Sequence, residues 1–485
     1  MRYPVSKAPS MSNISIGKTI ATGFGRRILC IGDVMLDIFE TGPVDRLSPE
    51  APVPVLLNPE RRYFAGGAAN LALNLHALGA KVHLIGVTGD DAAAETLKQH
   101  ISCAADLVVD PDRPTSVKHR IVASGTQLVR LDHEVQTPLS PAMADAVLGY
   151  VETQIIQSDM IVLSDYGKGT FSPNVLRKIR SLADNHSVPV LCDPYIPNID
   201  HYGRLLALKP NQKEAERLTG IEIVDDAAAE EAIGKILERV DTEFVCLTRG
   251  ADGLSLGQRG KRTWQYRASP REVFDVVGAG DAALAGFALG MVGTQRPDCA
   301  AKLSLCVSGL SVEHAGTRVV GIDEVLAETA PAGRPQSLSQ LRSKLMDWSD
   351  CGDIIGFTNG CFDVLHPGHI EVLRQAKASC DRLILAINSD ASVRRLKGAT
   401  RPHHSLEVRI GKVQSLGLAD AIIAFDEDTP AKLIAAVKPD RLIKGADYSV
   451  DEIVGSDVVL AEGGEVICVP LLEGFSSTSI LNTRN

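Results

Sequence analysis

Two histidines stand three residues apart in the stretch GCFDVLHPGHIEVLRQA, which spans residues 360–376. His366 and His369 flank a Pro-Gly pair, so both lie at a tight turn where an apolar run passes into a helix. Such histidines serve a metal centre, a phosphate site or a packed core. A metal centre needs further ligands beside them, but Cys361 and Asp363 precede the turn instead of sharing a helical face with the histidines. Imidazole N–H groups at a helix N-terminus suit a phosphate whose charge grows during a displacement.

A second stretch, DVVGAGDAALAGFALG at residues 275–290, joins small residues to an apolar helix. Gly278, Ala279 and Gly280 let backbone N–H groups approach an anion closely, and the helix N-terminus adds unpaired donors. Asp281 then stands where it could accept the proton of an attacking hydroxyl group. An ordinary glycine turn with an acidic residue near a helix start fits the same pattern. Spacing alone therefore leaves both interpretations open.

A third stretch, GGAANLALNLHALG at residues 66–79, again places glycines before an apolar helix. In this order the two glycine-rich stretches resemble both signatures of the ribokinase-like sugar kinase family, over about residues 27–325. The resemblance implies an α/β sandwich with ATP and Mg²⁺ as co-substrates. It also suggests a monovalent cation for the kinase domain. It also implies that Asp281 is the catalytic base and that Gly278–Gly280 form an anion hole.

The same resemblance assigns sugar hydroxyls to Asp37, Gly67 and Asn70, with Asp37 expected at the end of the first strand. A carboxylate and an amide supply the acceptors and donors that a polyol needs. For Asp37 alone, a turn or cap fits as well. One departure from the family is Val277, where a threonine is common, so a hydroxyl contact to phosphate is lost.

Asn211 and Glu214 follow the apolar LLALK run and offer the oxygen ligands that Mg²⁺ prefers. Their spacing equally fits a helix N-cap with its capping-box glutamate, and the family resemblance favours the nucleotide and Mg²⁺. Lys168 and Arg130 could neutralise a phosphate or lie in solvated loops. Asp165 and Lys168, both in LSDYGKG, are assigned to sugar binding.

The GCFDVLHPGH run resembles the HxGH motif of the nucleotidyltransferase superfamily, especially its cytidylyltransferase-like branch. The resemblance implies catalytic roles for His366 and His369. Its other assignments, to nucleotide or substrate, are Gly360, Phe362, Asp363, Lys397, Arg401, Lys444, Asp447, Ser477 and Thr478. A departure is Ser479, where many relatives carry lysine, so less positive charge is available there.

The elements that must position these residues are short β-rich runs alternating with Ala- and Leu-rich helical stretches. The first series comprises RRILCIGD, VHLIGVTGD, DMIVLSDYG, VPVLCDP, LLALKPN and EFVCLTRG. It predicts a doubly wound α/β sheet with ligands beyond the carboxyl ends of parallel strands. After a polar Pro/Gly stretch, a second series predicts a smaller Rossmann-like α/β domain: DIIGFTNG, DRLILAINSD, DAIIAFDED, DRLIKGAD and GEVICVP.

We therefore divide the chain into four parts. They are a flexible N-terminal extension over 1–22, a kinase domain over 23–328, a linker over 329–350 and a nucleotidyltransferase domain over 351–485.

Composition excludes several classes of protein. The net charge of −10 argues against a general nucleic-acid or anionic-membrane surface. No run is apolar enough for a membrane helix or a signal peptide, so we expect a cytoplasmic protein. The ten cysteines include no CxxC pair, and we expect neither disulfides nor a fixed protein metal site.

Over nearly its full length the chain resembles bifunctional heptose 7-phosphate kinase and heptose 1-phosphate adenylyltransferase enzymes. The stretches that carry this resemblance are RLSPEAPVPV, LSDYGKG, NGCFDVLHPGH, NSDASVRRLKG and DEDTPAKLI. It implies that ATP phosphorylates D-glycero-β-D-manno-heptose 7-phosphate at C1. AMP then joins heptose 1-phosphate to give ADP-heptose for lipopolysaccharide core. We expect heptose phosphates and ATP as partners, and a homodimer. Two alternatives stay open: a cytidylyltransferase for another polyol phosphate, or a non-catalytic nucleotide-binding module, in the second half.

Overall fold

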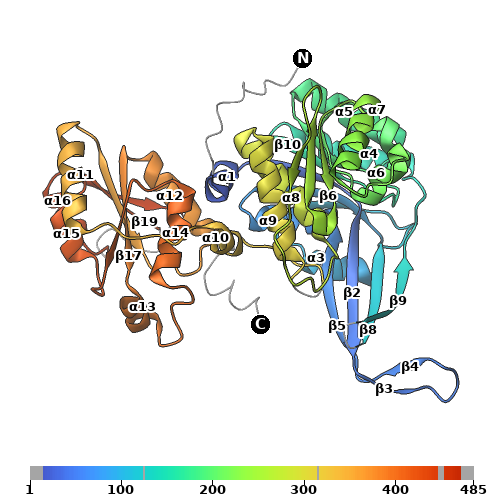
Figure 1. Ribbon diagram of the computed structural model, residues 1–485, viewed down its shortest axis with the longest axis horizontal. Helices are drawn as coiled ribbons and strands as arrows, with labels where there is room; N and C mark the ends of the chain where they lie inside the picture. Colours follow the sequence, from blue (N-terminus) through green and yellow to red (C-terminus); the bar gives the residue numbers. More distant parts are fainter. Residues whose placement is uncertain (1–14, 124–125, 314–315, 446–452, 471–485) are drawn as a thin grey trace. The chain divides into compact units, whose positions relative to one another are not determined.

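The computed structural model describes residues 15–123, 126–313, 316–445 and 453–470. Its contacts divide the chain into two compact units. Unit 1 has its described residues within 23–320, and unit 2 has its described residues within 15–22 and 321–470. Each unit has its own sheet and helices (Figure 1).

In unit 1 the described residues form a nine-stranded sheet in the order β15-β14-β13-β12-β11-β10-β1-β6-β7. The run from β13 to β7 is parallel, whereas β14 and β15 are antiparallel additions at one edge. The strands are β1 (Arg27–Gly32), β6 (Lys81–Thr88), β7 (Ala104–Val109), β10 (Met160–Ser164), β11 (Val190–Asp193), β12 (Leu205–Leu208), β13 (Thr242–Thr248), β14 (Leu254–Gln258) and β15 (Trp264–Tyr266). All six predicted strand runs are confirmed. Their near-continuous apolar sequences are typical of strands covered on both faces.

Helices cover both faces of this sheet (Figure 1). A large apolar core joins α4, α5 and α7 to one face, and α8 and α9 pack together on the other (Figure 1). Several helices begin at side-chain caps, including Ser140, Ser172 and Asp225, which fixes where each one starts. The helices are α2 (Ala68–Ala77), α3 (Ala92–Gln99), α4 (Pro141–Ile155), α5 (Pro173–His186), α6 (Gln212–Thr219), α7 (Asp226–Arg239), α8 (Ala279–Thr294) and α9 (Pro297–Ser311).

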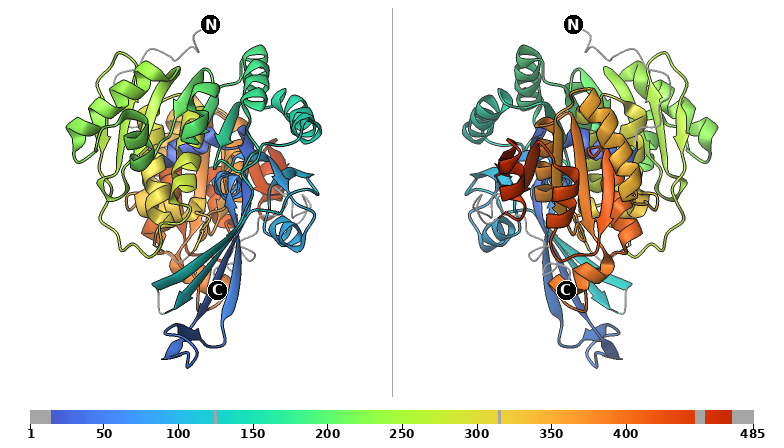
Figure 2. Two further views of the ribbon diagram at one scale, coloured as in Figure 1. Left: turned by 90° about the vertical axis from the view of Figure 1, so that its right-hand side faces the viewer. Right: turned by 90° about the vertical axis from the view of Figure 1, so that its left-hand side faces the viewer.

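A smaller sheet of unit 1, absent from our sequence-based expectations, extends away from this layered body (Figure 2). Its strands, in order, are β5 (Glu60–Gly67), β2 (Val34–Gly42), β8 (Val117–Ala123) and β9 (Thr126–His133). A separate hairpin joins β3 (Val44–Leu47) to β4 (Pro54–Leu56). This sheet corrects the position of Asp37, which lies within β2 and not at the end of the first strand. The apolar sequence runs on past Gly32, but β1 ends there and the chain crosses into a different sheet.

Unit 2 contains, within its described residues, a five-stranded parallel sheet in the order β18-β17-β16-β19-β20. The strands are β16 (Ile355–Gly360), β17 (Arg382–Asn388), β18 (Ala421–Phe425), β19 (Arg441–Gly445) and β20 (Glu465–Val469). The helices are α1 (Ile16–Gly23), α10 (Ile322–Thr329), α11 (Leu338–Asp350), α12 (Pro367–Ala378), α13 (Asp390–Lys397), α14 (Leu406–Leu416), α15 (Ala431–Val437) and α16 (Ser456–Ala461). The order of strands and helices is the predicted Rossmann-like alternation.

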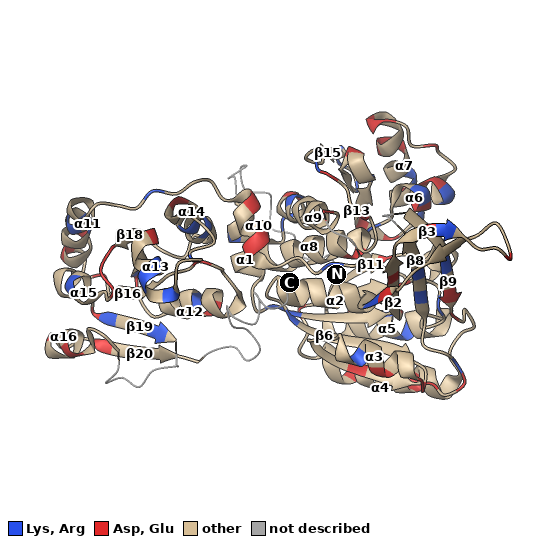
Figure 3. Ribbon diagram, turned by 90° about the horizontal axis from the view of Figure 1, so that it is seen from below, with Lys and Arg blue, Asp and Glu red and all other residues tan. Residues whose placement is uncertain are grey.

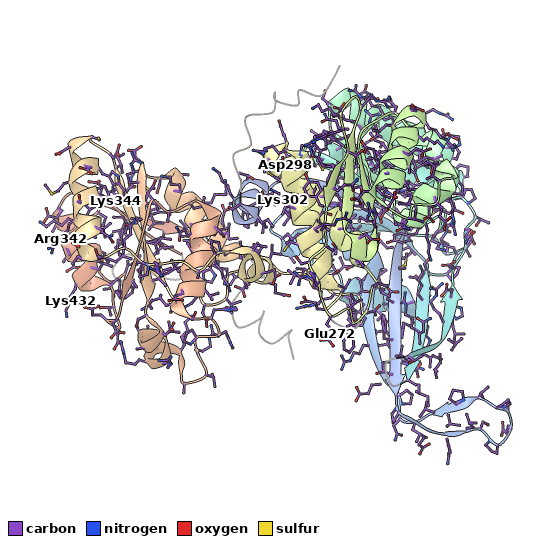
Figure 4. The ribbon with its side chains drawn as sticks, in the orientation of Figure 1. Glu272, Asp298, Lys302, Arg342, Lys344 and Lys432 are labelled. Carbon is purple, nitrogen blue, oxygen red and sulfur yellow. The ribbon has the colours of Figure 1, made fainter. Side chains whose placement is uncertain are left out.

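The contact-based units differ from the boundaries that we placed on the sequence. Unit 1 ends at Val320, so α10 belongs to unit 2 although the predicted kinase domain included it. The predicted linker contains α11, whose Leu341 and Trp348 lie in the apolar core of unit 2. Figure 4 labels Arg342 and Lys344 on α11, and the Lys344 ammonium donates to the Asp420 carbonyl at 3.1 Å. We did not predict this helix because its sequence is mostly polar and has few apolar positions.

The predicted N-terminal extension also contains structure. Residues 1–14 lie outside the described residues, but α1 follows them, and Ser15 Oγ donates to the Ser415 carbonyl at 2.7 Å. Among the helices that the structure describes, none has the length and apolar character to cross a membrane.

Candidate active sites

Asp281 lies in the first turn of α8, where the glycine-rich stretch places it. Gly278, the N-cap, has φ +79°, and a Cβ there would lie 2.7 Å from Asn70 Nδ2, so both the turn and the close approach require glycine. Asn70 Nδ2 donates to Asp281 Oδ2 at 3.0 Å, and the Tyr166 hydroxyl donates to Oδ1 at 2.7 Å. Asn74 Nδ2 donates to Asn70 Oδ1 at 3.0 Å, which fixes the orientation of the Asn70 amide.

The Asp281 carboxyl is almost completely buried, with 2% of its surface exposed. Burial raises its pKa to about 7, although the donors Asn70 and Tyr166 act in the opposite direction. A carboxyl group with this pKa exchanges its proton near neutral pH. Asp281 therefore has the property that a general base requires.

The Gly278–Gly280 segment forms the start of α8, where a helix leaves its first N–H groups without partners inside the helix. The Ala279 N–H donates to the Val276 carbonyl at 3.3 Å, outside the helix. Lys209 lies next to it: a Cβ on Gly280 would lie 3.7 Å from the Lys209 ammonium. The α8 N-terminus, its small residues and a buried ammonium thus meet at one point. Each of the three attracts an anion.

Lys209 pairs with Asp193, whose carboxylate lies 3.0 Å from the ammonium. Burial alone would lower the pKa of Lys209, but Asp193 and Glu214 raise it above its usual value. Burial and the neighbouring Asp193 raise the pKa of Glu214. Two carboxylates beside one ammonium leave excess negative charge here, and they leave oxygen atoms of the kind that Mg²⁺ binds.

Asn211 and Glu214 also form the capping box that their spacing allowed. Asn211 Oδ1 accepts from the Glu214 backbone at 3.0 Å, and Glu214 Oε2 accepts from the Asn211 backbone at 2.8 Å. The cap starts α6 and holds both side chains at the carboxyl end of the sheet. The assignment of these residues to nucleotide and Mg²⁺ stays a prediction.

Asp37 faces basic and hydroxyl groups within unit 1. Its Oδ1 accepts from Arg120 on β8 at 2.5 Å and its Oδ2 accepts from Thr317 at 3.2 Å, while only 3% of the residue is exposed. A Cβ on Gly66 would lie 2.2 Å from Asp37 Oδ2, so the neighbouring strand β5 passes very close to the carboxylate. The contact of Asp37, Gly67 and Asn70 with sugar hydroxyls stays a prediction.

Asp33 was missed by the sequence-based assignment and organises the loop after β10. Its Oδ2 accepts from the backbone N–H groups of Tyr166 and Lys168 at 2.8 and 3.0 Å, and its Oδ1 accepts from Thr170 at 3.3 Å. Asp33 directly follows β1 and is 2% exposed. An acidic residue immediately after a buried strand was the available signal.

Asp165 is itself part of the loop after β10 and stabilises it. Its Oδ1 accepts from the Gly167 backbone at 2.9 Å, while its Oδ2 accepts from Asn198 at 2.8 Å and from the Tyr202 hydroxyl at 2.7 Å. Burial and the nearby Asp33 raise the pKa of Asp165 to about 6. These contacts position Tyr166, and sugar binding by Asp165 stays a prediction.

Lys168 lies among charged groups of the small sheet. Its ammonium contacts Glu134 Oε1 at 2.5 Å and is largely buried. Burial lowers the pKa of nearby Lys118, and the charges of Lys168 and Arg130 lower it further. Three basic groups therefore lie close enough to repel one another, which is an arrangement that favours an added anion. Arg130 is itself paired with Asp132 at 2.7 Å on the exposed strand β9.

In unit 2, His366 and His369 meet at the N-terminus of α12, where His366 is the N-cap. Their ring centroids are 3.8 Å apart, and the Phe362 ring packs 5.5 Å from that of His369. Both Nδ1 atoms are buried without a hydrogen-bond partner among the described residues. Burial lowers the pKa of His366 to about 4 and that of His369 well below its usual value. Both imidazoles are therefore neutral at pH 7.

Asp363 and Arg401 contact each other at the base of this site. Asp363 is 2% exposed; its Oδ2 accepts from Arg401 at 2.6 Å, and its Oδ1 accepts from the backbones of His403 and His404 at 2.8 and 3.1 Å. The predicted nucleotide ligand Asp363 thus holds the loop before α14. Arg409, which the sequence analysis missed, is completely buried and donates to the Cys361 carbonyl at 2.6 Å.

A basic group of α13 lies near the histidines, and another, on β19, lies beside Asn359 of β16. Figure 3 shows Lys and Arg along α13, whose last turn carries Lys397, and the charge of Lys397 contributes to the low pKa of both histidines. Burial lowers the pKa of Lys444 to about 8, and its ammonium donates to the Asn359 carbonyl at 3.3 Å. The Phe362 ring lies against Gly360, where a Cβ would approach it to 3.0 Å. Predicted site residues Asp447, Ser477 and Thr478 lie outside the described residues.

Within the described part of the chain, no cluster of three or more His, Cys, Asp or Glu side chains is arranged to hold a metal ion. The oxygen donors beside Lys209 fit a hydrated Mg²⁺ that arrives with a nucleotide, because Mg²⁺ keeps several waters and needs few protein ligands.

Comparison with known proteins gives a family for each half of the chain. The pfkB family carbohydrate kinase profile matches residues 26–323, and the cytidylyltransferase-like profile matches residues 357–481. Bifunctional protein HldE of Hyphomonas neptunium is 42% identical over 467 residues, which cover 94% of this chain and 96% of that protein. Bifunctional protein HldE of Caulobacter vibrioides is 43% identical over 472 residues, which cover 95% and 97%.

Solved structures agree with the fold of unit 1. Phosphofructokinase-2 from Escherichia coli in complex with substrates and products superposes with a TM-score of 0.52 at 19% identity, covering 62% of this chain and 97% of that one. The chain belongs to the HldE family of bifunctional proteins, as a pfkB-type carbohydrate kinase joined to a cytidylyltransferase-like nucleotidyltransferase.

Proposed function

We propose that unit 1 phosphorylates D-glycero-β-D-manno-heptose 7-phosphate at C1 and that unit 2 transfers AMP from ATP to heptose 1-phosphate. The products are ADP-heptose, which serves lipopolysaccharide core, and pyrophosphate. The observation that carries the kinase step is a buried carboxyl group at a helix N-terminus, with a pKa of about 7, beside a buried ammonium. The relation to HldE proteins supports pairing the two steps in one chain.

In the kinase step, the C1 hydroxyl oxygen attacks the γ-phosphorus of ATP while its proton passes to Asp281. The bond from the γ-phosphorus to its bridging oxygen breaks, and ADP leaves. Backbone N–H groups of Gly278–Gly280 and the Lys209 ammonium stabilise the charge on the transferring phosphoryl group. Asn70 and Tyr166 hold the carboxylate so that it faces the hydroxyl.

Asn211 and Glu214, at the start of α6, would hold Mg²⁺ through their side-chain oxygen atoms. When bound, the ion neutralises the nucleotide phosphates. A monovalent cation is a further proposed requirement, and kinase rates in potassium and in tetramethylammonium salts would test it.

In the transfer step, a phosphate oxygen of heptose 1-phosphate attacks the α-phosphorus of ATP, and pyrophosphate leaves. Neutral imidazole N–H groups of His366 and His369 donate to oxygens of the α-phosphate as negative charge grows there. Lys397 adds positive charge on the same side. Gly360, Phe362, Arg401 and Lys444 complete the proposed nucleotide and substrate surface.

The choice of nucleotide separates this function from its main rival. The match of unit 2 to the cytidylyltransferase-like profile favours CTP as the alternative donor. We would measure pyrophosphate release by the full chain with heptose 1-phosphate and either ATP or CTP. Release with ATP supports adenylyl transfer, release only with CTP supports the rival, and nucleotide binding without release in either case indicates a regulatory module.

The setting of these activities is part of the same proposal. We propose a cytoplasmic enzyme, because both nucleotide and sugar phosphates are cytoplasmic substrates, and a homodimer. Sedimentation of the full chain at several concentrations would test the dimer, and cell fractionation would test the location.

The kinase rate should fall with decreasing pH as Asp281 becomes protonated. We expect kcat/KM to decrease about tenfold per unit below a pH of about 7, because only the ionised carboxylate accepts a proton. Tyr166→Phe removes a donor that lowers this pKa, so the acidic limb should move to higher pH. Both pH profiles are measured with the same substrates, so ionisation of the substrates affects the two proteins equally and does not contribute to the difference between them. If the acidic limbs of the two pH profiles coincide, Tyr166 does not lower the pKa of Asp281.

Lys168→Ala should raise the KM for the 7-phosphorylated sugar about tenfold or more while changing the KM for ATP little. A largely buried ammonium beside other basic groups would make charge-assisted hydrogen bonds to the 7-phosphate of the sugar. Because these contacts are equally strong in the ground state and the transition state, their loss raises KM and leaves kcat unchanged. Lys178→Ala, which removes an exposed lysine of the same unit, is the matched control. Equal effects on both substrates would instead make Lys168 a structural partner of Glu134.

A further inference from the structure

We propose that Asp323 is a positioning residue of the nucleotidyl-transfer site, which holds the backbone that presents His366. The inference rests on the proposed role of His366 in unit 2. Asp323 lies in the first turn of α10, well before the transferase motifs in the sequence.

The Asp323 carboxylate makes contacts in three directions. Its Oδ1 accepts from the Leu365 backbone N–H at 2.9 Å and from the Lys412 ammonium at 2.6 Å, and its Oδ2 lies 3.2 Å from His404 Nε2. Asp323 is 3% exposed, and Lys412 is completely buried. Burial alone would raise the pKa of Asp323, but the contacts with His404, Lys412 and Leu365 lower it to about 2. The group is therefore ionised and fixed.

The contact with Leu365 matters because that residue directly precedes His366. Neither His366 Nδ1 nor His369 Nδ1 has a hydrogen-bond partner among the described residues, so side-chain hydrogen bonds do not orient the rings from that side. The rings depend instead on packing and on the backbone at the start of α12. A hydrogen bond to the preceding peptide group is then a direct control on the position of His366.

A second carboxylate, that of Asp363, lies on the other side of the turn that carries His366. Asp363 fixes the loop of Arg401, His403 and His404, and His404 in turn contacts Asp323. The two carboxylates thus hold the histidine turn and the facing loop together. The buried pair with Lys412 joins this arrangement to α14.

The position of Asp323 in the chain explains why family comparison does not point to it. The carbohydrate kinase profile ends at residue 323, and the cytidylyltransferase-like profile begins at residue 357. By its contacts, however, α10 belongs to unit 2. The transfer site is therefore built with a residue that lies outside the segment recognised as a transferase.

The test compares two variants of the full chain that both lack the buried ion pair. Asp323→Asn with Lys412→Met keeps an acceptor for the Leu365 N–H, whereas Asp323→Leu with Lys412→Met removes it without leaving a charge buried. We expect the asparagine variant to transfer AMP within about threefold of the wild type. We expect kcat of the leucine variant to fall on the order of 10²-fold with little change in the KM for ATP, because small displacements of a catalytic group have effects of this size.

Thermal midpoints and kinase turnover of both variants provide the structural control, and Glu328→Gln removes an exposed acid from the same helix. If leucine does not fit, Asp323→Ala in the Lys412→Met background replaces it. Equal transfer by the two folded double variants, whether high or low, would overturn the inference, since the acceptor would then have no effect. Full transfer by His366→Ala would instead overturn the proposed function itself.

Discussion

Replacing Asp281 by asparagine is expected to lower kinase turnover by about 10²- to 10⁴-fold while leaving ATP binding nearly unchanged. The amide has the size of the carboxylate but cannot take a proton from the attacking hydroxyl. Asn70 can still donate to the amide oxygen, and the Tyr166 hydroxyl can rotate to accept from the amide nitrogen, so the local packing is kept. Turnover and ATP affinity would be measured on the same preparation.

Two controls accompany this measurement. Asp298→Asn changes a partly exposed acid on α9 that pairs with Arg296 and should leave kinase turnover unchanged (Figure 4). AMP transfer by unit 2 should stay at the wild-type rate in both variants. Kinase turnover of Asp281→Asn within about tenfold of wild type would show that another group takes the proton.

Replacing either His366 or His369 by alanine is expected to lower AMP transfer about 10²- to 10³-fold. The donors act on charge that appears only as the bond to the α-phosphorus forms, so nucleotide binding should weaken far less than the rate. Kinase turnover should not change. Pyrophosphate release, ATP affinity and kinase turnover would be measured for each variant.

Other roles for the histidines predict different results. If the rings only pack against each other and Phe362, transfer would fall no further than the folded fraction, which thermal unfolding reports. If they hold zinc, a chelator would abolish transfer by the wild type in excess Mg²⁺, and added zinc would restore it. A stably folded double alanine variant with a normal transfer rate would contradict the phosphate role.

The sequence predicted those parts of the fold whose signals are local. The predicted strands of the parallel sheets are short apolar runs that end in turn residues, and the glycines before Asp281 and Asn70 mark helix starts. The strand β7 was not predicted, because it is only partly buried and its sequence AADLVV has a weaker apolar signal. Family resemblance then supplied roles for these positions. Asp281, Asn70 and Gly278, from two separate stretches, do meet in the structure.

Contacts between distant residues could not be predicted in this way. Nothing near Asp33 in the sequence indicates that it binds the backbone of Tyr166, because the two residues meet only when β1 and β10 pair. The small mixed sheet was missed because its strands are interspersed with those of the main sheet along the chain. Likewise α10 follows the kinase elements in sequence, but its contacts assign it to unit 2.

The raised pKa of Asp281 makes the folding of unit 1 depend on proton concentration. The folded protein holds this proton up to a pH of about 7, whereas an unfolded chain releases it near 3.8. Between these values the native state binds more protons, so this group makes the free energy of unfolding fall as the pH rises. Between pH 3.8 and about 7, this group lowers the free energy of unfolding by a total on the order of a few kcal/mol. That loss is a large part of the stability of a typical domain. At neutral pH unit 1 is therefore less stable than it would be with a neutral residue at position 281, and this loss accompanies the proton affinity that a base needs.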